Sequence, residues 1–251
     1  MEWSEEAIVL AARRHGESAL IVQLLTRGHG RHAGLVRGGQ GRKLRTIYQI
    51  GNRLAVTWKA RLAEHLGGFA GELLHGHAAR FIDDPARLGC LAAAAAMADS
   101  ALPEREPHPR AYDGLSALLW ALDADSGWAL GYVEWEAALL TELGFGLDLS
   151  RCAATGETAD LIYVSPKSGQ AVSSKAGEPY RERLLALPGF LLPGSNAAPT
   201  PQDVLDGLAL TAFFLDRRVF QPHARKLPAA RSRFVDALRR IATLPRGETS
   251  P

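Results

Sequence analysis

A basic, glycine-rich stretch runs His32-Ala33-Gly34-Leu35-Val36-Arg37-Gly38-Gly39-Gln40-Gly41-Arg42-Lys43-Leu44-Arg45. Its apolar start leads into three glycines within four residues, and three positive side chains follow without a nearby acid. Glycine lets the backbone adopt a positive φ, and arginine and lysine suit phosphate contacts. The stretch therefore predicts a strand that leads into a mobile basic loop touching a polyanion. A solvated hairpin tip is the alternative.

Positive charge is concentrated near the N-terminus. The 251 residues contain 29 lysines and arginines and 27 acids, so the formal net charge is only +2. Residues 1–61 nevertheless hold eleven arginines and lysines against four glutamates, a surplus of seven positive charges. Such asymmetry suggests a nucleic-acid or anionic-membrane partner. A second basic cluster occupies residues 217–240.

Cysteine content and hydropathy argue against a secreted, disulfide-rich protein and against a membrane-spanning one. Cys90 and Cys152 are far apart and cannot form a disulfide framework, which is typical of a reduced, cytosolic protein. The N-terminus carries acids where a signal peptide needs bases. No segment approaches about 20 uninterrupted apolar residues, so we expect no membrane span. The length suits one to three domains.

Short strand-like runs separated by turn residues dominate residues 1–76. Five strands with breaks every 8–12 residues or so predict a small barrel of the OB-fold type. The runs are Ala7–Ala11, Ala19–Leu25, His32–Val36, Leu54–Trp58 and Leu66–Leu74. Such barrels bind single-stranded nucleic acids through a basic groove and through aromatic side chains on which the bases stack. Trp58 and Tyr48 are candidate platforms, although core packing is the favoured role of Trp58.

Residues 77–251 change to a helical period and predict a packed helical domain. Asp84-Pro85 and Thr200-Pro201-Gln202-Asp203 have the residue types of helix starts. Expected helices cover residues 85–102, 111–122, 128–143, 180–187, 200–220 and 229–244, and residues 163–172 predict a hairpin with a glycine turn. The predicted fold class is therefore α+β, a five-stranded OB-fold barrel followed by an α-helical domain with a small β-hairpin insert.

Several motifs of the N-terminal part, in this order, resemble the RecO family of recombination mediators. They are Glu6-Ala7-Ile8-Val9-Leu10, Gly16-Glu17-Ser18-Ala19-Leu20, Leu25-Thr26, Gly30-Arg31 and Gly34-Leu35-Val36-Arg37-Gly38. The resemblance continues through Glu142–Cys152 and through Leu227–Arg231 before the final helix. It implies a DNA repair and recombination protein that acts without turnover chemistry.

Many members of that family bind zinc through two Cys-x-x-Cys pairs in an insert, here residues 152–176. By this alignment the pairs fall on Cys152 and Thr155, and on Ser173 and Ala176, so three ligands are missing. Structural zinc needs four closed ligands. We therefore expect a degenerate zinc-ribbon-like insert with no metal and no cofactor, whose folding a chelator leaves unchanged.

Two sets of basic residues are the candidate binding sites. The DNA-binding set is Arg14, Arg31, Arg37, Arg42, Lys43, Arg45, Arg53 and Lys59. A second set is assigned to the acidic C-terminal tail of the single-strand binding protein (SSB): Arg217, Arg218, Arg225 and Lys226. His29 and His32 are interpreted as surface histidines near phosphate rather than as a metal site. No catalytic residues are predicted, because neither a Gly-x-Ser-x-Gly elbow nor a phosphate loop is present.

The resemblance implies a mediator of the RecF pathway in the cytoplasm, associated with the nucleoid. Its implied activities are binding of single-stranded and duplex DNA, strand annealing, and assistance to RecA in loading on SSB-coated strands together with RecR. Two alternatives remain: an enzyme with a basic substrate groove, such as a nuclease or deaminase, and a scaffold that binds only protein. A mobility shift at two salt concentrations distinguishes the three.

Overall fold

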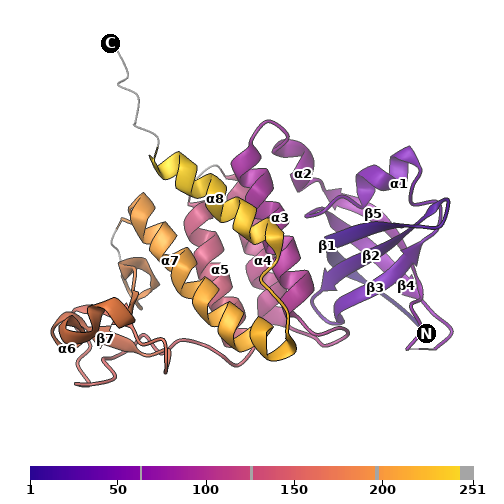
Figure 1. Cartoon of the computed structure of the whole chain (residues 1–251). Coiled ribbons are helices and arrows are strands. Elements are labelled where there is room, and N and C mark those ends of the chain that lie inside the picture. The colour runs from indigo at the N-terminus through magenta and orange to yellow at the C-terminus, as the bar shows by residue number, and fades with distance from the viewer. Residues whose placement is uncertain (63, 125–126, 196–197, 244–251) are drawn as a thin grey trace, which may run out of the picture.

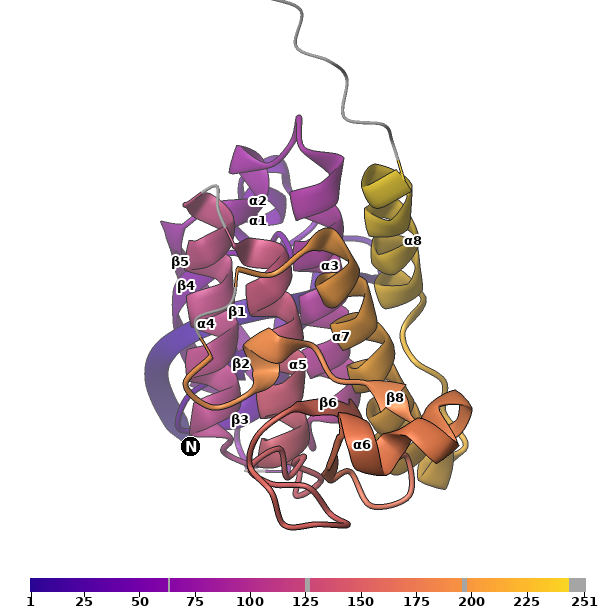
Figure 2. The same ribbon diagram turned by 90° about the vertical axis from the view of Figure 1, so that its left-hand side faces the viewer.

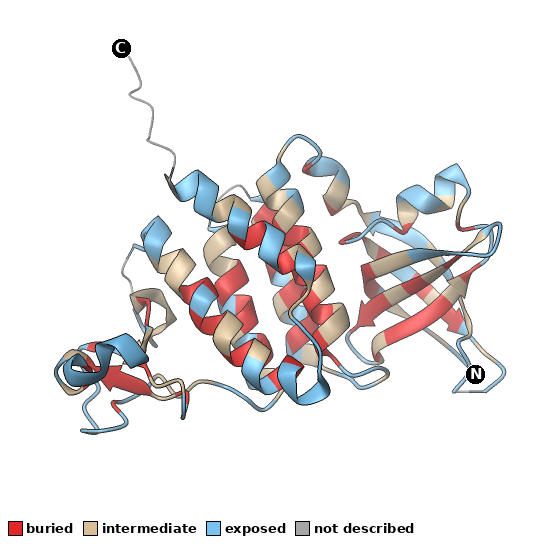
Figure 3. Cartoon of the chain, in the orientation of Figure 1, coloured by how far each residue is buried: buried red, intermediate tan, exposed pale blue. Residues whose placement is uncertain are grey.

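The computed structural model describes residues 1–62, 64–124, 127–195 and 198–243. Figure 1 shows a β-barrel at one end, a bundle of helices in the middle and a small sheet at the other end. Seen from the small sheet, the main helices stand side by side (Figure 2). Buried residues form one cluster inside the barrel and a larger one among the helices (Figure 3). The predicted α+β class is confirmed.

Five strands close the barrel in the order β1-β2-β3-β5-β4. The neighbours are antiparallel except β3 and β5, which meet in parallel at one pair, Leu35 with Gly68. The strands are β1 (Glu2–His15), β2 (Ala19–Thr26), β3 (Gly30–Val36), β4 (Arg53–Lys59) and β5 (Gly68–His75). The five predicted strands are therefore confirmed.

Strand β1 is much longer than the apolar run that predicted it. Its first half pairs with β4 and its second half with β2, and the two pairings overlap at Ala7 and Ile8. The register shifts between Val9 and Ala11, and such a bulge bends a strand so that one strand can serve two neighbours. The polar residues at the two ends of β1 do not follow the apolar pattern of a strand, and they are strand residues only because they pair with β4 and β2.

Aromatic side chains fill the barrel. Trp58 and Tyr48 are each 2% exposed, and the Trp58 indole Nε1–H donates to the Leu66 carbonyl at 3.1 Å. The packing is tight enough that a Cβ at Gly34 would lie 2.3 Å from the Phe69 ring. Core packing of Trp58 is confirmed, and the prediction that Tyr48 or Trp58 could be a stacking platform is wrong because both rings are buried.

The predicted mobile loop after β3 is in part a helix. Residues 37–40 form a turn, and helix α1 (Arg42–Ile47) follows between β3 and β4. Leu44 and Ile47 pack against the barrel core, one helical turn apart on the same face. That contact with the barrel orders a segment whose composition alone indicates a loop.

The helical domain contains the main predicted helices. They are α3 (Pro85–Ala101), α4 (Pro109–Asp123), α5 (Trp128–Glu142), α7 (Pro201–Phe214) and α8 (Ala229–Thr243). A short helix that was not predicted, α2 (His77–Arg80), precedes them. The Asp84 carboxylate accepts from the backbone N–H groups of Ala86 and Arg87 at 3.1 and 3.0 Å. Thr200 and Asp203 form the capping box of α7. Both predicted helix starts are thus confirmed.

Two helical segments differ in detail from the prediction. Helix α4 begins at Pro109, two residues earlier than predicted, because proline suits the first helical position. The helix after Thr200 continues to Phe220 as predicted, but residues Leu215–Phe220 form a π-helical turn, followed by a 3-10 turn over Gln221–His223. None of the helices that the structure describes is long and apolar enough to cross a bilayer.

A three-stranded sheet in the order β7-β6-β8 forms the far end of the molecule. The hairpin is confirmed: β6 (Leu161–Val164) pairs with β7 (Ala171–Ser173). The helix predicted over residues 180–187 is wrong. A short helix α6 (Ser174–Gly177) and a 3-10 turn (Glu178–Arg183) lead into β8 (Leu185–Ala186), and a 3-10 turn follows at Gly189–Leu191. Pairing of β8 with β6 overrides the local helical pattern.

The barrel and the helices share a packed junction. Ile8 and Leu10 of β1 and Leu25 of β2 are buried in the helical cluster rather than in the barrel core. Helix α3 packs beside β1. The outer face of β1 and β2 at this end is therefore covered by helices, and the opposite end of the barrel, which carries α1, projects away from them (Figure 1).

Candidate nucleic-acid interface

Helix α1 presents three predicted DNA-binding side chains to solvent. Arg42, Lys43 and Arg45 are exposed, and they lie off the face through which Leu44 and Ile47 pack on the barrel. The first turn of α1 contains no acid. Within the described part of the chain none of the three forms an ion pair, so their charges are available to an anion in solution.

Two further predicted residues lie at the same end of the barrel. Arg37 follows β3 directly, and Arg14 lies near the tip of the β1–β2 hairpin; both are exposed. Gln40 fastens the two segments together, because its Nε2–H₂ group donates to the carbonyls of Gly16 and Ala19 at 3.0 Å each. We name Arg14, Arg37, Arg42, Lys43 and Arg45 the basic end of the barrel.

A groove leads from the basic end along the side of the barrel. Its volume is about 770 Å³, and Arg37, Leu44, Tyr48, Lys59 and Gly68 are among the residues that line it. The groove includes the site where β3 and β5 share only one residue pair. It therefore joins the basic end to Lys59 at the end of β4.

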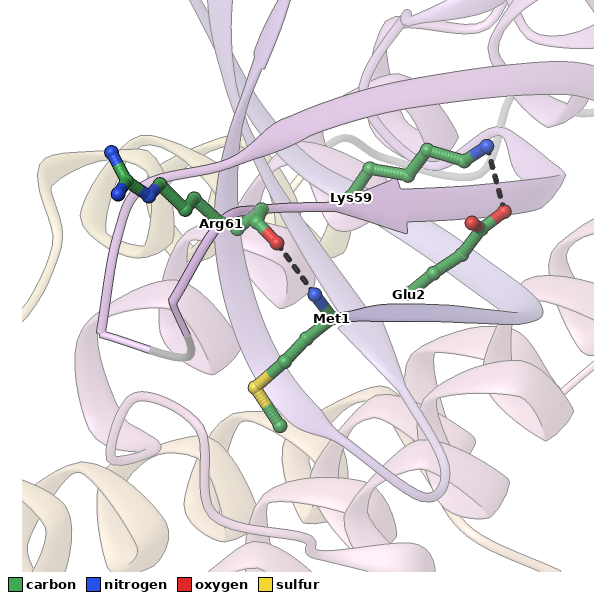
Figure 4. A pocket seen from close by; sticks show the side chains of 5 residues that line it. Met1, Glu2, Lys59 and Arg61 are labelled. Carbon is green, nitrogen blue, oxygen red and sulfur yellow. Dashed lines mark hydrogen bonds and ion pairs between the residues drawn. The ribbon is translucent and has the colours of Figure 1, made fainter.

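A second hollow of about 590 Å³ continues beyond Lys59 and is lined by Met1, Glu2, Lys59, Ala60 and Arg61 (Figure 4). Lys59 Nζ lies 2.8 Å from a Glu2 carboxylate oxygen, and the Met1 ammonium donates to the Ala60 carbonyl at 2.7 Å. Glu2 thus offsets the charge of Lys59, whereas exposed Arg61 restores a positive edge. The predicted DNA-binding set does not include Arg61. Its position in the β4–β5 loop could have indicated it, because this loop borders the binding face of OB-folds.

Two of the predicted DNA-binding residues lie elsewhere. Arg31 Nε–H donates to the Leu102 carbonyl at 2.9 Å, and its Nη1 is 3.3 Å from Asp99. Arg53 is paired with Glu6 at 2.5 Å. Each guanidinium group is thus paired with an acid, and both side chains are less than one-fifth exposed. The structure separates Arg31 and Arg53 from the basic end, so neither belongs to the proposed DNA surface.

The two N-terminal histidines are part of an aromatic cluster. His29 Nδ1 lies 2.9 Å from Glu5, and its ring stacks on Trp3 with centroids 4.1 Å apart. His32 is buried between the rings of Trp3 and Trp58, and burial lowers its pKa to about 4. The interpretation of His32 as a surface histidine near phosphate is therefore wrong.

Some of the exposed C-terminal basic residues also make structural contacts. Arg225 Nη1 donates to the Ser100 carbonyl at 2.8 Å, where α3 ends. Arg218 donates to the Lys167 carbonyl at 3.0 Å, and the Arg217 guanidinium lies 5.8 Å from the centre of the Phe213 ring. All four side chains of this set, including Lys226, remain exposed.

Sequence reasoning missed a buried ion pair in the helical domain. Arg231 of α8 and Glu136 of α5 approach to 2.6 Å, and the Thr211 hydroxyl of α7 donates to the same carboxylate at 2.6 Å. Burial alone would lower the pKa of Arg231, but Glu136 raises it above its ordinary value. These contacts join three helices. Arg231, the last residue of the Leu227–Arg231 motif that resembles the RecO family, therefore stabilises the fold.

The insert does not fit a structural zinc site. Cys152 Sγ accepts from the backbone N–H of Ser173 at 3.3 Å and lies 3.5 Å from its hydroxyl. Burial opposes ionisation of the Cys152 thiol, but hydrogen bonds with Thr155 and Ser173 lower its pKa to about 6. A single thiol cannot complete the four ligands of structural zinc. Thr155 and Ser173, whose hydroxyls hydrogen-bond this sulfur, occupy two of the four positions that align with the zinc ligands of the family.

The described residues also contain one group of three potential metal ligands, His75, His77 and Asp123. Neither the prediction of catalytic residues nor that of metal ligands included it. His75-Gly76-His77 was a visible signal in the sequence, but Asp123 lies far away along the chain. Desolvation lowers the pKa of His77 to about 4, although the nearby Asp123 carboxylate opposes that shift.

Comparison with known proteins accounts for nearly the whole chain. The family profile described as Recombination protein O N terminal matches residues 1–77, and that described as Recombination protein O C terminal matches residues 82–227. The chain is 54% identical to DNA repair protein RecO of Rhodospirillum centenum over 97% of each chain. It is 52% identical to the protein of the same name from Rhodospirillum rubrum, over 98% of this chain and 100% of the relative. The chain therefore belongs to the recombination protein O (RecO) family of DNA repair proteins.

Proposed function

We propose that this chain binds single-stranded and duplex DNA through the basic end of its barrel and acts as a recombination mediator without turnover chemistry. The observation that carries the proposal is the gathering of Arg14, Arg37, Arg42, Lys43 and Arg45, all exposed, at one end of an OB-type barrel. Charges of this kind bind phosphate largely irrespective of sequence. The groove past Lys59 and Arg61 extends the path for a strand.

Strand annealing follows from the same charges. Two complementary strands repel each other through their phosphates, and arginine or lysine side chains that neutralise both strands lower that repulsion. The aromatic side chains Trp58, Tyr48 and Phe69 are buried in the barrel. The bases of a bound strand are therefore left free to pair, which suits annealing better than stacking on the protein would.

The proposal extends to protein partners. An acidic tail, such as the C-terminus of SSB, is recognised by clustered positive charges. Arg217, Arg218 and Lys226 are exposed, and Arg217 lies over the Phe213 ring, so this surface offers positive charge and an apolar contact. Binding of that tail, cooperation with RecR and assistance to RecA in loading on coated strands are the proposed roles of this family member.

A mobility-shift experiment tests the proposal. A labelled single-stranded oligonucleotide and a duplex are each titrated with the full chain at low and at moderate salt, and the DNA is afterwards examined for cleavage or base modification. We expect binding that weakens steeply with salt, faster annealing of complementary strands, and intact DNA. Cleaved or modified DNA would instead favour a nuclease or deaminase, and absence of binding would favour a protein-only scaffold.

The tail contact has its own test. A peptide with the acidic SSB tail is titrated into the full chain and into an Arg217→Ala/Arg218→Ala variant, with Arg181→Ala/Arg183→Ala in the small sheet domain as the control of equal charge. We expect weaker peptide binding only in the first variant. Equal affinity in all three proteins would remove this surface from the proposal.

A further inference from the structure

Three metal-ligating side chains converge where the barrel meets the helices. His75 ends β5, His77 begins α2, and Asp123 ends α4. His75 Nε2 lies 2.9 Å from Oδ2 of Asp123, and His77 Nδ1 lies 3.1 Å from the same oxygen. The ligand atoms of all three lie within 4.8 Å of one another. Segments about 45 residues apart in the chain thus bring their donor atoms to one point.

His77 is the unusual member of this cluster. Its side chain is 0% exposed, yet neither ring nitrogen makes a hydrogen bond with a residue that the structure describes. A buried polar group without a hydrogen-bond partner destabilises the folded state and requires an explanation. The 3.1 Å approach of Nδ1 to Asp123 lacks the geometry of a hydrogen bond, and a cation bound by both atoms would give this nitrogen a partner.

We propose that His75, His77 and Asp123 bind a Zn²⁺ ion. Two imidazole nitrogens and one carboxylate oxygen form a donor set that zinc uses in sites with a water as fourth ligand. Tetrahedral zinc with bonds of about 2.0–2.1 Å keeps its donor atoms roughly 3.4 Å apart, close to the observed 2.9 and 3.1 Å. The ion would replace the missing hydrogen-bond partner of His77.

The surroundings of the cluster orient its carboxylate. Arg80 Nε lies 3.3 Å from Oδ1 of Asp123, which leaves Oδ2 to the two imidazoles. Outer contacts of this kind hold a metal ligand in position. The Arg80 side chain is 56% exposed, so solvent screens its repulsion of a cation. Arg53, the other nearby cation, is paired with Glu6.

One aromatic side chain, Trp120, packs against both histidines of the cluster. The Trp120 ring lies 4.6 Å from the ring of His75 and 5.2 Å from that of His77. An apolar covering limits water access and strengthens electrostatic attraction to a cation. Because the ligands come from both the barrel and α4, the ion would fasten the two domains together, independently of the DNA-binding charges.

The test uses the full chain purified without a histidine tag. Zinc is measured after gel filtration, its affinity is determined against a competing chelator, and Co²⁺ is substituted to give a visible absorption band. The variants are Asp123→Asn and His77→Gln. The controls are His15→Gln, an exposed histidine of the hairpin, and Cys152→Ser, which removes the cysteine of the degenerate insert.

We expect about one zinc per chain, a melting temperature that zinc raises and a chelator lowers, and a Co²⁺ band. Loss of an outer contact typically weakens metal binding 10- to 100-fold, so loss of a direct ligand in Asp123→Asn should weaken it by more than about 100-fold. Both controls should bind like the unaltered chain. The proposal is overturned if the unaltered chain binds no stoichiometric zinc, if Asp123→Asn retains full affinity, or if Cys152→Ser loses it. If His77→Gln fails to fold, the zinc affinity of Asp123→Asn and the effect of a chelator on the unaltered chain still test whether this cluster binds zinc.

Discussion

The two ends of the barrel use positive charge in opposite ways. At the end away from the helices, Arg37 and the basic residues of α1 are exposed, and the described residues give them no ion pair. At the end against the helices, Arg31 is held by Asp99 and the Leu102 carbonyl, and Arg53 is held by Glu6. Paired guanidinium groups fix the fold, whereas unpaired ones remain available to a polyanion.

This difference shows that the number of basic residues in a segment overstates its binding surface. Eight positions in the first 61 residues were assigned to DNA, but burial and partners reduce the exposed and unpaired set to five. The energetic consequence is that the two groups should respond differently to mutation. Removing a paired charge should cost stability, and removing an unpaired one should cost binding.

The largest loss of stability is expected at the buried pair of the helical domain. Arg231→Ala leaves the Glu136 carboxylate buried without its cation, which typically costs about 3–5 kcal/mol. Arg233→Ala, an exposed neighbour on α8, is the matched control and should change little. Denaturant unfolding measures both, and equal stability of the two variants would contradict the structural role of this pair.

The next largest effect is a pH dependence of the barrel. Burial lowers the pKa of His32 to about 4, below its ordinary value of about 6.5, so the unfolded chain binds the proton more readily. Stability from this group is therefore complete above about pH 6.5 and is lost as the pH falls toward 4. The loss amounts to about 3 kcal/mol at pH 4.

His32→Phe should remove that part of the pH dependence, because a phenyl ring suits the contacts with Trp3 and Trp58 and carries no titratable group. Unfolding free energies of the unaltered chain and of His32→Phe are compared from pH 7 to pH 4. The two curves should diverge as the pH falls. Parallel curves would show that His32 is not the titrating group.

A smaller loss is expected at the junction of the domains. Arg31→Met keeps an apolar stem but removes the charged hydrogen bond to the Leu102 carbonyl, at a cost of about 1–3 kcal/mol. Arg13→Met is the control, since Arg13 lies 3.9 Å from the same Asp99 but its side chain is 78% exposed. Thermal unfolding distinguishes them, and a greater loss in the Arg13 variant would contradict the assignment.

Much of the fold could be predicted from the sequence because its signals are local. Alternating apolar residues and glycine turns indicated the strands, and Asp84 and Thr200 marked helix starts. Helix α1 was missed because six residues with three bases carry too little helical period, and β8 was missed because only its pairing with β6 makes it a strand.

The candidate site was harder to predict because charge in sequence does not reveal partners. Arg31 and Arg37 have similar surroundings in the sequence, but Asp99, which lies 68 residues beyond Arg31, pairs with only one of them. The convergence of His75 and His77 with Asp123 likewise depends on how the barrel docks on α4. Such contacts are set by tertiary packing, which no local pattern contains.

The smallest effect on stability is expected at the basic end of the barrel, where a loss of DNA binding is expected instead. Arg42→Ala/Lys43→Ala/Arg45→Ala should change the unfolding free energy by less than about 0.5 kcal/mol, because exposed residues without partners contribute little. The control of equal charge is Arg151→Ala/Arg181→Ala/Arg183→Ala. These residues are exposed, and they belong to the segment before Cys152 and to the 3-10 turn before β8.

The deciding measurement is the slope of log affinity for single-stranded DNA against log salt concentration in these two variants and the unaltered chain. Each lost phosphate contact should flatten the slope by about 0.7, so the basic-end variant should bind more weakly with a slope shallower by about 2. The control should match the unaltered chain. Unchanged affinity and slope in the basic-end variant, or an equal change in the control, would contradict the claim that these side chains grip the phosphate backbone.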